Sequence, residues 1–138
     1  MKTLTALATL LILGAGISFA EPFPESTEEL RTEAAKAKLN ATSGIEVIYA
    51  KGLCCPSCAI GVRKKVSQLD FVDRDRFNKG VDLDPKFQLV SIAMKNGRSA
   101  DYEAITQAIQ NAGYDPVRAY HLDNDAIATR SMVPTAVK

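Results

Sequence analysis

The clearest patterns of apolar and polar residues lie in the middle of the chain. Ile45, Val47 and Tyr49 occupy alternate positions, as in a strand with one buried face. From about residue 57 to residue 69, apolar side chains recur at near-helical spacing while the positions between them stay polar. This apolar set is Ile60, Val62, Val66 and Leu69. The patterns predict a strand over 45–50 followed by an amphipathic helix over 57–69.

The second half of this region carries a matching set of elements. A short strand over 81–83 and a longer one over 87–94 are separated by a proline-containing turn. Ser99 is placed to cap a second helix that ends at Gly113. The apolar residues on one face of this helix are Tyr102, Ile105, Ile109 and Ala112. A last short strand is expected over 116–120.

The order of the predicted elements is β-α-β-β-α-β. This order is typical of an α+β domain of the ferredoxin-like type, in which two helices cover one face of a four-stranded antiparallel sheet. We therefore expect a ferredoxin-like βαββαβ sandwich over residues 44–121. A chain of 138 residues leaves no room for a second large domain.

The first twenty residues carry the pattern of a secretory signal peptide, which we expect to cover residues 1–20. Lys2 gives a positive start, an apolar stretch follows, and Ser18, Phe19 and Ala20 form a small-x-small cleavage pattern. A retained membrane anchor is the alternative, but a spanning helix needs about 20 apolar residues and this stretch is shorter. We therefore expect an exported protein whose signal is removed and which does not itself span a membrane.

Two polar segments flank the expected domain. Residues 21–43 offer large apolar side chains at Leu30 and Leu39 alone, and we expect a polar, weakly helical linker there. Residues 122–138 show no periodicity, and we expect a disordered tail.

Charge limits the kinds of partner. The chain has 17 Lys and Arg against 16 Asp and Glu, and loss of Lys2 with the signal makes the balance even. A nucleic-acid-binding protein would carry a basic excess, so no nucleic-acid partner is expected. Arg63, Lys64 and Lys65 form one basic cluster, which is either a solvated helix face or a docking patch.

All three cysteines lie where the first predicted strand ends and the first predicted helix begins, in the run from Gly52 to Cys58. A thiolate is the form of cysteine that binds metal, and the start of a helix favours negative charge. Two thiolates on one short loop can hold a single cation. Soft cations prefer such ligands, whereas Mg²⁺ and Ca²⁺ prefer oxygen. The loop therefore predicts a site for a soft metal ion.

The run Gly52-Leu53-Cys54-Cys55-Pro56-Ser57-Cys58 resembles the metal-binding loop of the heavy-metal-associated domain family. The likeness covers about residues 45 to 120 and includes Val62-Arg63-Lys64-Lys65-Val66-Ser67, Val81-Asp82-Leu83 and Asn111-Ala112-Gly113-Tyr114. Periplasmic mercuric-ion-binding proteins and copper chaperones are the members that it is most similar to.

The resemblance implies a non-enzymatic, periplasmic carrier of Cu(I) or Hg(II) with Cys55 and Cys58 as its two ligands. Tyr114 matches the aromatic residue that lies beside the loop in this family. Such a carrier is a monomer that docks transiently on a membrane metal transporter or on another metal-binding protein. These implications are expectations for the structure and for experiment.

The sequence departs from the family pattern at three places. Leu53 stands where methionine is usual, and the segment 73–79 is longer than the typical link. Cys54 adds a third thiol beside the expected pair. It is an auxiliary metal ligand, a partner for an intermolecular disulfide, or a bystander that points away.

An enzyme is the alternative class. Cys55-Pro56-Ser57-Cys58 also resembles the Cys-Pro-x-Cys motif of glutaredoxin-like thiol-disulfide oxidoreductases. That fold needs a helix between its second and third strands, and residues 70–86 lack the apolar periodicity for one. A structural disulfide within the loop is a third possibility.

Overall fold

The computed structural model describes residues 25–57 and 59–133. The expected signal peptide, Cys58 and residues 134–138 lie outside the described residues. The described elements, in chain order, are α1 (Glu28–Ala41), β1 (Ile45–Lys51), α2 (Ile60–Val66), β2 (Val81–Asp84), β3 (Leu89–Ala93), α3 (Tyr102–Asn111), β4 (Asp115–Asp123) and β5 (Ala126–Ser131).

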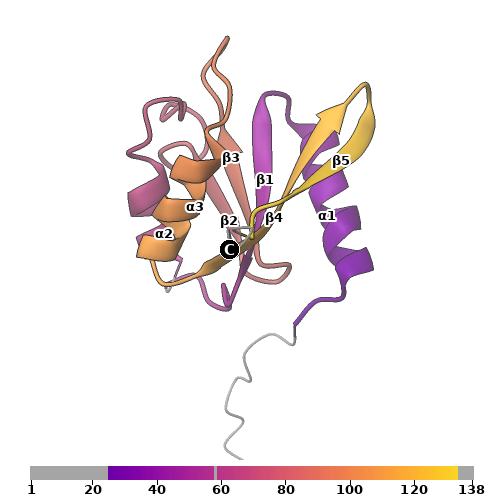
Figure 1. Ribbon diagram of the computed structural model, residues 1–138, viewed down its shortest axis with the longest axis horizontal. Coiled ribbons are helices and arrows are strands. Elements are labelled where there is room, and N and C mark those ends of the chain that lie inside the picture. The colour runs from indigo at the N-terminus through magenta and orange to yellow at the C-terminus, as the bar shows by residue number, and fades with distance from the viewer. Residues whose placement is uncertain (1–24, 58, 134–138) are drawn as a thin grey trace, which may run out of the picture.

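The five strands form one antiparallel sheet in the order β2-β3-β1-β4-β5. The predicted α+β class is confirmed, and the elements from β1 to β4 follow the predicted β-α-β-β-α-β order. Their strand order is compatible with a ferredoxin-like arrangement. The prediction of four strands and two helices is wrong, because the structure adds β5 at one edge and α1 on the second face (Figure 1).

The sheet separates two apolar clusters, because side chains along a strand alternate between its faces. On β1, Ile48 and Ala50 face α2 and α3, whereas Val47 and Tyr49 face α1. Figure 1 shows α2 and α3 on one side of the sheet and α1 on the other. The central strand β1 is therefore covered on both faces.

The expected linker contains a packed helix. In α1, Arg31, Ala35 and Leu39 recur every fourth residue and are buried against the sheet, while Leu30 is 57% exposed. The Thr27 side chain caps the first turn by accepting a hydrogen bond from the Leu30 N–H at 3.4 Å. The helical character predicted for this segment is confirmed, but it is not a linker; its packing was missed because the buried stripe contains an arginine and an alanine rather than large apolar residues.

The expected disordered tail is also wrong for residues 122–133. β4 runs on to Asp123, and β5 returns antiparallel after a two-residue turn at Asn124 and Asp125. Both turn residues have positive φ, 48° and 64°, which matches the type I′ turn that joins right-twisted strands. Asparagine and aspartate tolerate this backbone conformation better than most residues do.

Two predicted element boundaries shift for local reasons. β3 begins at Leu89 rather than residue 87, because Gln88 has a φ of 57° and belongs to the turn after β2. α3 is capped by Asp101 rather than Ser99. The Asp101 carboxylate accepts hydrogen bonds from the N–H groups of Glu103 and Ala104, each at 3.0 Å.

Gly80 lies at the end of the long connection between α2 and β2, where the backbone leaves no room for a side chain. We predict that alanine at this position destabilises the protein. The φ of Gly80 is +83°, and an added Cβ would collide with Val72 and lie 2.7 Å from the Asp73 carbonyl oxygen. We expect Gly80→Ala to lower the free energy of unfolding by about 2 kcal/mol, or the melting temperature by about 10 °C. Thermal melts followed by circular dichroism measure this.

Gly97 is the matched control, because its φ is +74° and an added Cβ would meet nothing within 4 Å. Gly97→Ala carries the backbone strain without the collision, so it should cost about 1 kcal/mol. Equal losses in the two variants would contradict the collision at Gly80.

Candidate functional site

The cysteine loop leaves the central strand through Gly52 and is anchored by Leu53. Gly52 has a φ of +91°, a conformation that glycine adopts without steric cost. The Leu53 side chain is fully buried in the cluster under α2 and α3, and its N–H donates to the Ala50 carbonyl at 3.3 Å. Leucine thus fills the core at the position where the family pattern has methionine. The next residues are held at the surface directly beside the core.

Cys54 and Cys55 are both partly exposed in this loop. Cys54 is a free cysteine, whereas Cys55 is disulfide-bonded. The Cys55 sulfur also lies 3.7 Å from the Ser57 hydroxyl oxygen. Cys58, the second expected metal ligand, lies outside the described residues. The structure therefore places one expected ligand, Cys55, and the auxiliary thiol, Cys54, on the same exposed loop.

The segment after Cys55 coils toward α2 but enters the helix later than the sequence predicts. The Ala59 N–H donates to the Cys55 carbonyl at 3.2 Å, and the Ile60 N–H donates to the Ser57 carbonyl at 3.4 Å. The helix itself begins at Ile60, where no side chain caps its first turn. Buried Ala59 and Val62 fix this end of the loop to the core. Both ends of the loop are therefore attached to packed residues.

Tyr114 lies beside the cysteine loop, just after the end of α3. An added Cβ at Gly52 would lie 3.6 Å from a ring carbon of Tyr114, which places the ring beside the start of the loop. Burial raises the pKa of the Tyr114 hydroxyl, and the nearby Cys54 charge raises it further. The ring therefore shields one side of the loop and stays neutral at physiological pH.

Known proteins add nothing to this picture. Comparisons with protein-family models, with curated proteins and with solved structures found no match. The resemblance to heavy-metal-associated domains thus rests on the residues of the loop and its flanking elements. Within residues 25–57 and 59–133, no group of three or more His, Cys, Asp and Glu side chains could hold a metal ion. The two-thiolate site requires Cys58 and stays a prediction.

The same described residues include no helix that is long and apolar enough to cross a membrane.

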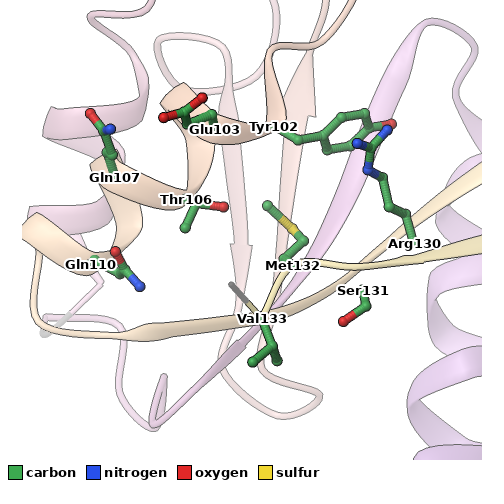
Figure 2. Close-up of a pocket in the computed structure, with 9 residues that line it drawn as sticks. All are labelled: Tyr102, Glu103, Thr106, Gln107, Gln110, Arg130, Ser131, Met132 and Val133. Carbon is green, nitrogen blue, oxygen red and sulfur yellow. The ribbon is translucent and has the colours of Figure 1, made fainter. Parts of the chain in front are cut away.

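A groove between α3 and the end of β5 is a second surface feature, with a volume of about 370 Å³ (Figure 2). At one end, the Arg130 guanidinium lies 4.7 Å from the centre of the Tyr102 ring. The Tyr102 hydroxyl donates to the Glu46 carboxylate at 3.0 Å, so α3, β1 and β5 are joined there. The sequence did not predict this contact, because its residues are far apart in the chain and β5 was not expected.

Burial of Glu46 has a consequence for pH, which is our second prediction. Burial raises its pKa from the ordinary 4.5, opposed by the Tyr102 hydrogen bond and by His121. Because the folded state holds this proton more tightly than the unfolded state, the contribution of Glu46 to stability is fully present below pH 4.5 and is lost as the pH rises through the raised pKa. Glu46→Gln should therefore stabilise the protein at pH 7 and have no effect on stability at pH 4.

Urea unfolding of wild type and Glu46→Gln between pH 4 and pH 8 measures this dependence. Glu33→Gln on the exposed side of α1 is the control and should leave the pH profile unchanged. A Glu46→Gln variant that is equally or less stable than wild type at pH 7 would contradict the conclusion that burying the charged Glu46 carboxylate destabilises the folded state.

Proposed function

We propose that this protein is a carrier of soft metal ions built on a ferredoxin-like heavy-metal-associated domain. In its reduced form, the thiolates of Cys55 and Cys58 bind one Cu(I) or Hg(II) ion as cargo. A partner protein with its own thiolates then takes the ion by ligand exchange. The partner class is a membrane metal transporter or another metal-binding protein, met in the periplasm after export.

The observation that carries the proposal is the position of Cys55. It lies partly exposed on a loop that joins the central strand to α2, and buried Leu53 and Ala59 hold the loop on either side. Such a loop presents sulfur to solvent without exposing the core. Thiolate ligands favour soft cations over hard ones.

Two-coordinate binding suits transfer. An ion held by two thiolates keeps an open side, where a third thiolate can attack before the first bonds break. A closed site with four ligands, as in structural zinc sites, leaves no such position. Cys54 beside the pair could supply a third sulfur and slow the release of the ion, or point away from it.

Metal stoichiometry of the reduced protein tests the proposal. Cu(I), Hg(II) and Zn(II) are added separately in competition with a thiol buffer, and thiolate-to-metal absorption reports ligation. We expect one tightly held Cu(I) or Hg(II) per chain and weak binding of Zn(II). Absence of competitive binding for all three ions would overturn the carrier.

A second function is favoured by one observation: Cys55 is disulfide-bonded and has the free thiol of Cys54 next to it. Disulfides in an exported protein can exchange with thiolates of other proteins. A thiol-disulfide oxidoreductase would cycle rapidly against glutathione and would catalyse reduction of a model disulfide. A carrier would bind metal in competition with thiols and would show no such turnover.

A further inference from the structure

The two edge strands of the sheet, β2 and β5, differ in whether their outward backbone groups have hydrogen-bond partners. On β2, those of Val81 have partners. The outward N–H of Val81 donates to the Asn78 carbonyl at 3.2 Å, and the Val81 carbonyl accepts from the Arg63 side chain at 3.3 Å. Asp82 and Asp84 add charge to this four-residue strand and lie 3.5 and 3.2 Å from the Lys38 amine. A short, charged and covered edge resists pairing with another strand.

The turn between β4 and β5 determines which backbone groups of β5 point outward. In a two-residue hairpin, the residues that flank the turn, here Asp123 and Ala126, form a hydrogen-bonded pair. Bonded and non-bonded pairs then alternate along the strands. The Met132 N–H donates to the Val117 carbonyl at 3.0 Å, as this alternation requires for an even-numbered residue. Even-numbered residues of β5 therefore bond to β4, and Ile127, Thr129 and Ser131 direct their N–H and C=O groups outward.

Among the described strands, β5 pairs with β4 alone, and it forms the outer edge of the sheet (Figure 1). Its sequence, Ala-Ile-Ala-Thr-Arg-Ser, contains neither proline nor lysine, the residues that commonly protect an edge. The one charged side chain, Arg130, stacks on Tyr102 over the face of the sheet (Figure 2). Among the described strands, none pairs with the outward backbone groups of Ile127, Thr129 and Ser131.

We propose that β5 pairs antiparallel with β5 of a second copy of this chain, so that one sheet continues across a two-fold axis. The charges of the hairpin favour this occupant. Asp123 and Asp125 make its turn acidic, whereas Arg130 near its base forms no ion pair among the described residues. Antiparallel pairing lays the acidic turn of each copy beside the basic base of the other. The side-chain charges of the whole chain nearly balance, so two copies do not repel strongly.

The alternation of inward and outward backbone groups along β5 also selects the register between the two β5 strands. Outward residues must oppose outward residues, and an axis through Ala128 opposes Ile127 of one copy to Thr129 of the other. This register places Arg130 opposite Ala126 of the second copy, one residue from its acidic turn. The dimer replaces the monomer that the family resemblance implies, and it does not depend on metal binding.

Thr129→Pro tests the pairing. It removes an N–H that points outward, so β4 loses no hydrogen bond, while the dimer loses two bonds related by the axis. We expect wild type to form a concentration-dependent dimer in sedimentation equilibrium, and Thr129→Pro to raise its dissociation constant about 10- to 30-fold. Thr129→Val keeps the N–H and the branched side chain and should dimerise like wild type. The reference protein and each variant carry Cys54→Ser in addition, and all samples are metal-free and contain reductant, which excludes disulfide-linked dimers.

A charge reversal keeps the proposal testable if the proline variant fails to fold. Arg130→Glu should weaken the dimer and reverse its dependence on salt, because like charges then face each other, and Asp125→Lys in the same chain should restore both. A wild type that stays monomeric at millimolar concentration overturns the proposal. So does a monomer whose β5 edge instead binds an unrelated extended peptide, or a dimer that Thr129→Pro leaves unchanged.

Discussion

Replacing Cys55 with serine should lower the affinity of the reduced protein for Cu(I) or Hg(II) by about 100-fold or more. A structural metal site with four ligands gains about 12 kcal/mol in binding, or about 3 kcal/mol for each ligand, and each 1.4 kcal/mol is a tenfold change in affinity. In a site of two ligands, the loss of one also removes half of the coordination. Cys58→Ser should show the same loss, as measured by competition with a thiol buffer.

Cys54→Ser is the matched control, because it removes a neighbouring thiol from the same exposed loop. We expect it to change the affinity less than tenfold. Circular dichroism should show the same fold in each variant, since Cys54 and Cys55 are not part of the buried core. Equal losses in all three variants would overturn the two-ligand assignment and favour a site of three sulfurs.

Arg31→Ala should have the largest effect on stability, about 3 kcal/mol in the free energy of unfolding. Arg31 is 4% exposed, and its guanidinium stacks 3.7 Å from the centre of the Tyr49 ring. It donates to the carbonyls of Ser26 and Phe87 at 2.7 and 3.2 Å, and to the Gln88 side chain at 3.3 Å. Truncation removes the donor from one buried and two partly buried acceptors and opens a gap beneath α1.

Tyr49 takes part in the same contact. Burial, together with the hydrogen bond from its hydroxyl to Glu25 at 2.7 Å, raises its pKa to about 12. The ring under Arg31 therefore stays neutral at any pH at which the protein is studied. The effect of Arg31→Ala should accordingly vary little between pH 6 and pH 9.

Urea unfolding at pH 7 measures the loss. Glu33→Ala, on the exposed side of the same helix, controls for the change in helix sequence and should alter stability by less than about 0.5 kcal/mol. Arg31→Lys keeps the charge but not the planar fork, so an intermediate loss is expected. Similar values for Arg31→Ala and Glu33→Ala would show that α1 is not coupled to the sheet.

The elements from β1 to β4 could be predicted because their apolar residues repeat at regular short spacing. In β1, the alternation at Ile45, Val47 and Tyr49 marks one buried face of a strand. In α3, Ile105 and Ile109 lie four residues apart and mark the buried face of a helix. The described part of the cysteine loop, Gly52 to Ser57, follows β1 as predicted, although α2 begins at Ile60 rather than at residue 57.

The missed elements lack such periods. In α1 the buried stripe is Arg31, Ala35 and Leu39. An arginine in a sequence indicates an exposed position, and its buried partners Tyr49 and Gln88 lie far away in the chain. β5 consists of small and polar residues. Its one usable signal is the turn pair Asn124-Asp125 between Leu122 and Ile127, which is weaker than Asn-Gly.

Burial of β1 on both faces gives the cysteine loop two ends of unequal local stability. The strand that enters the loop is paired on both sides, so its amide protons should exchange with solvent only when the whole domain unfolds. The helix that leaves the loop spans seven residues, and its first turn lacks a side-chain cap. That turn can open while the sheet stays intact. Any movement of the sulfur atoms during transfer of a metal ion would thus occur at the α2 end of the loop, while Leu53 stays in place.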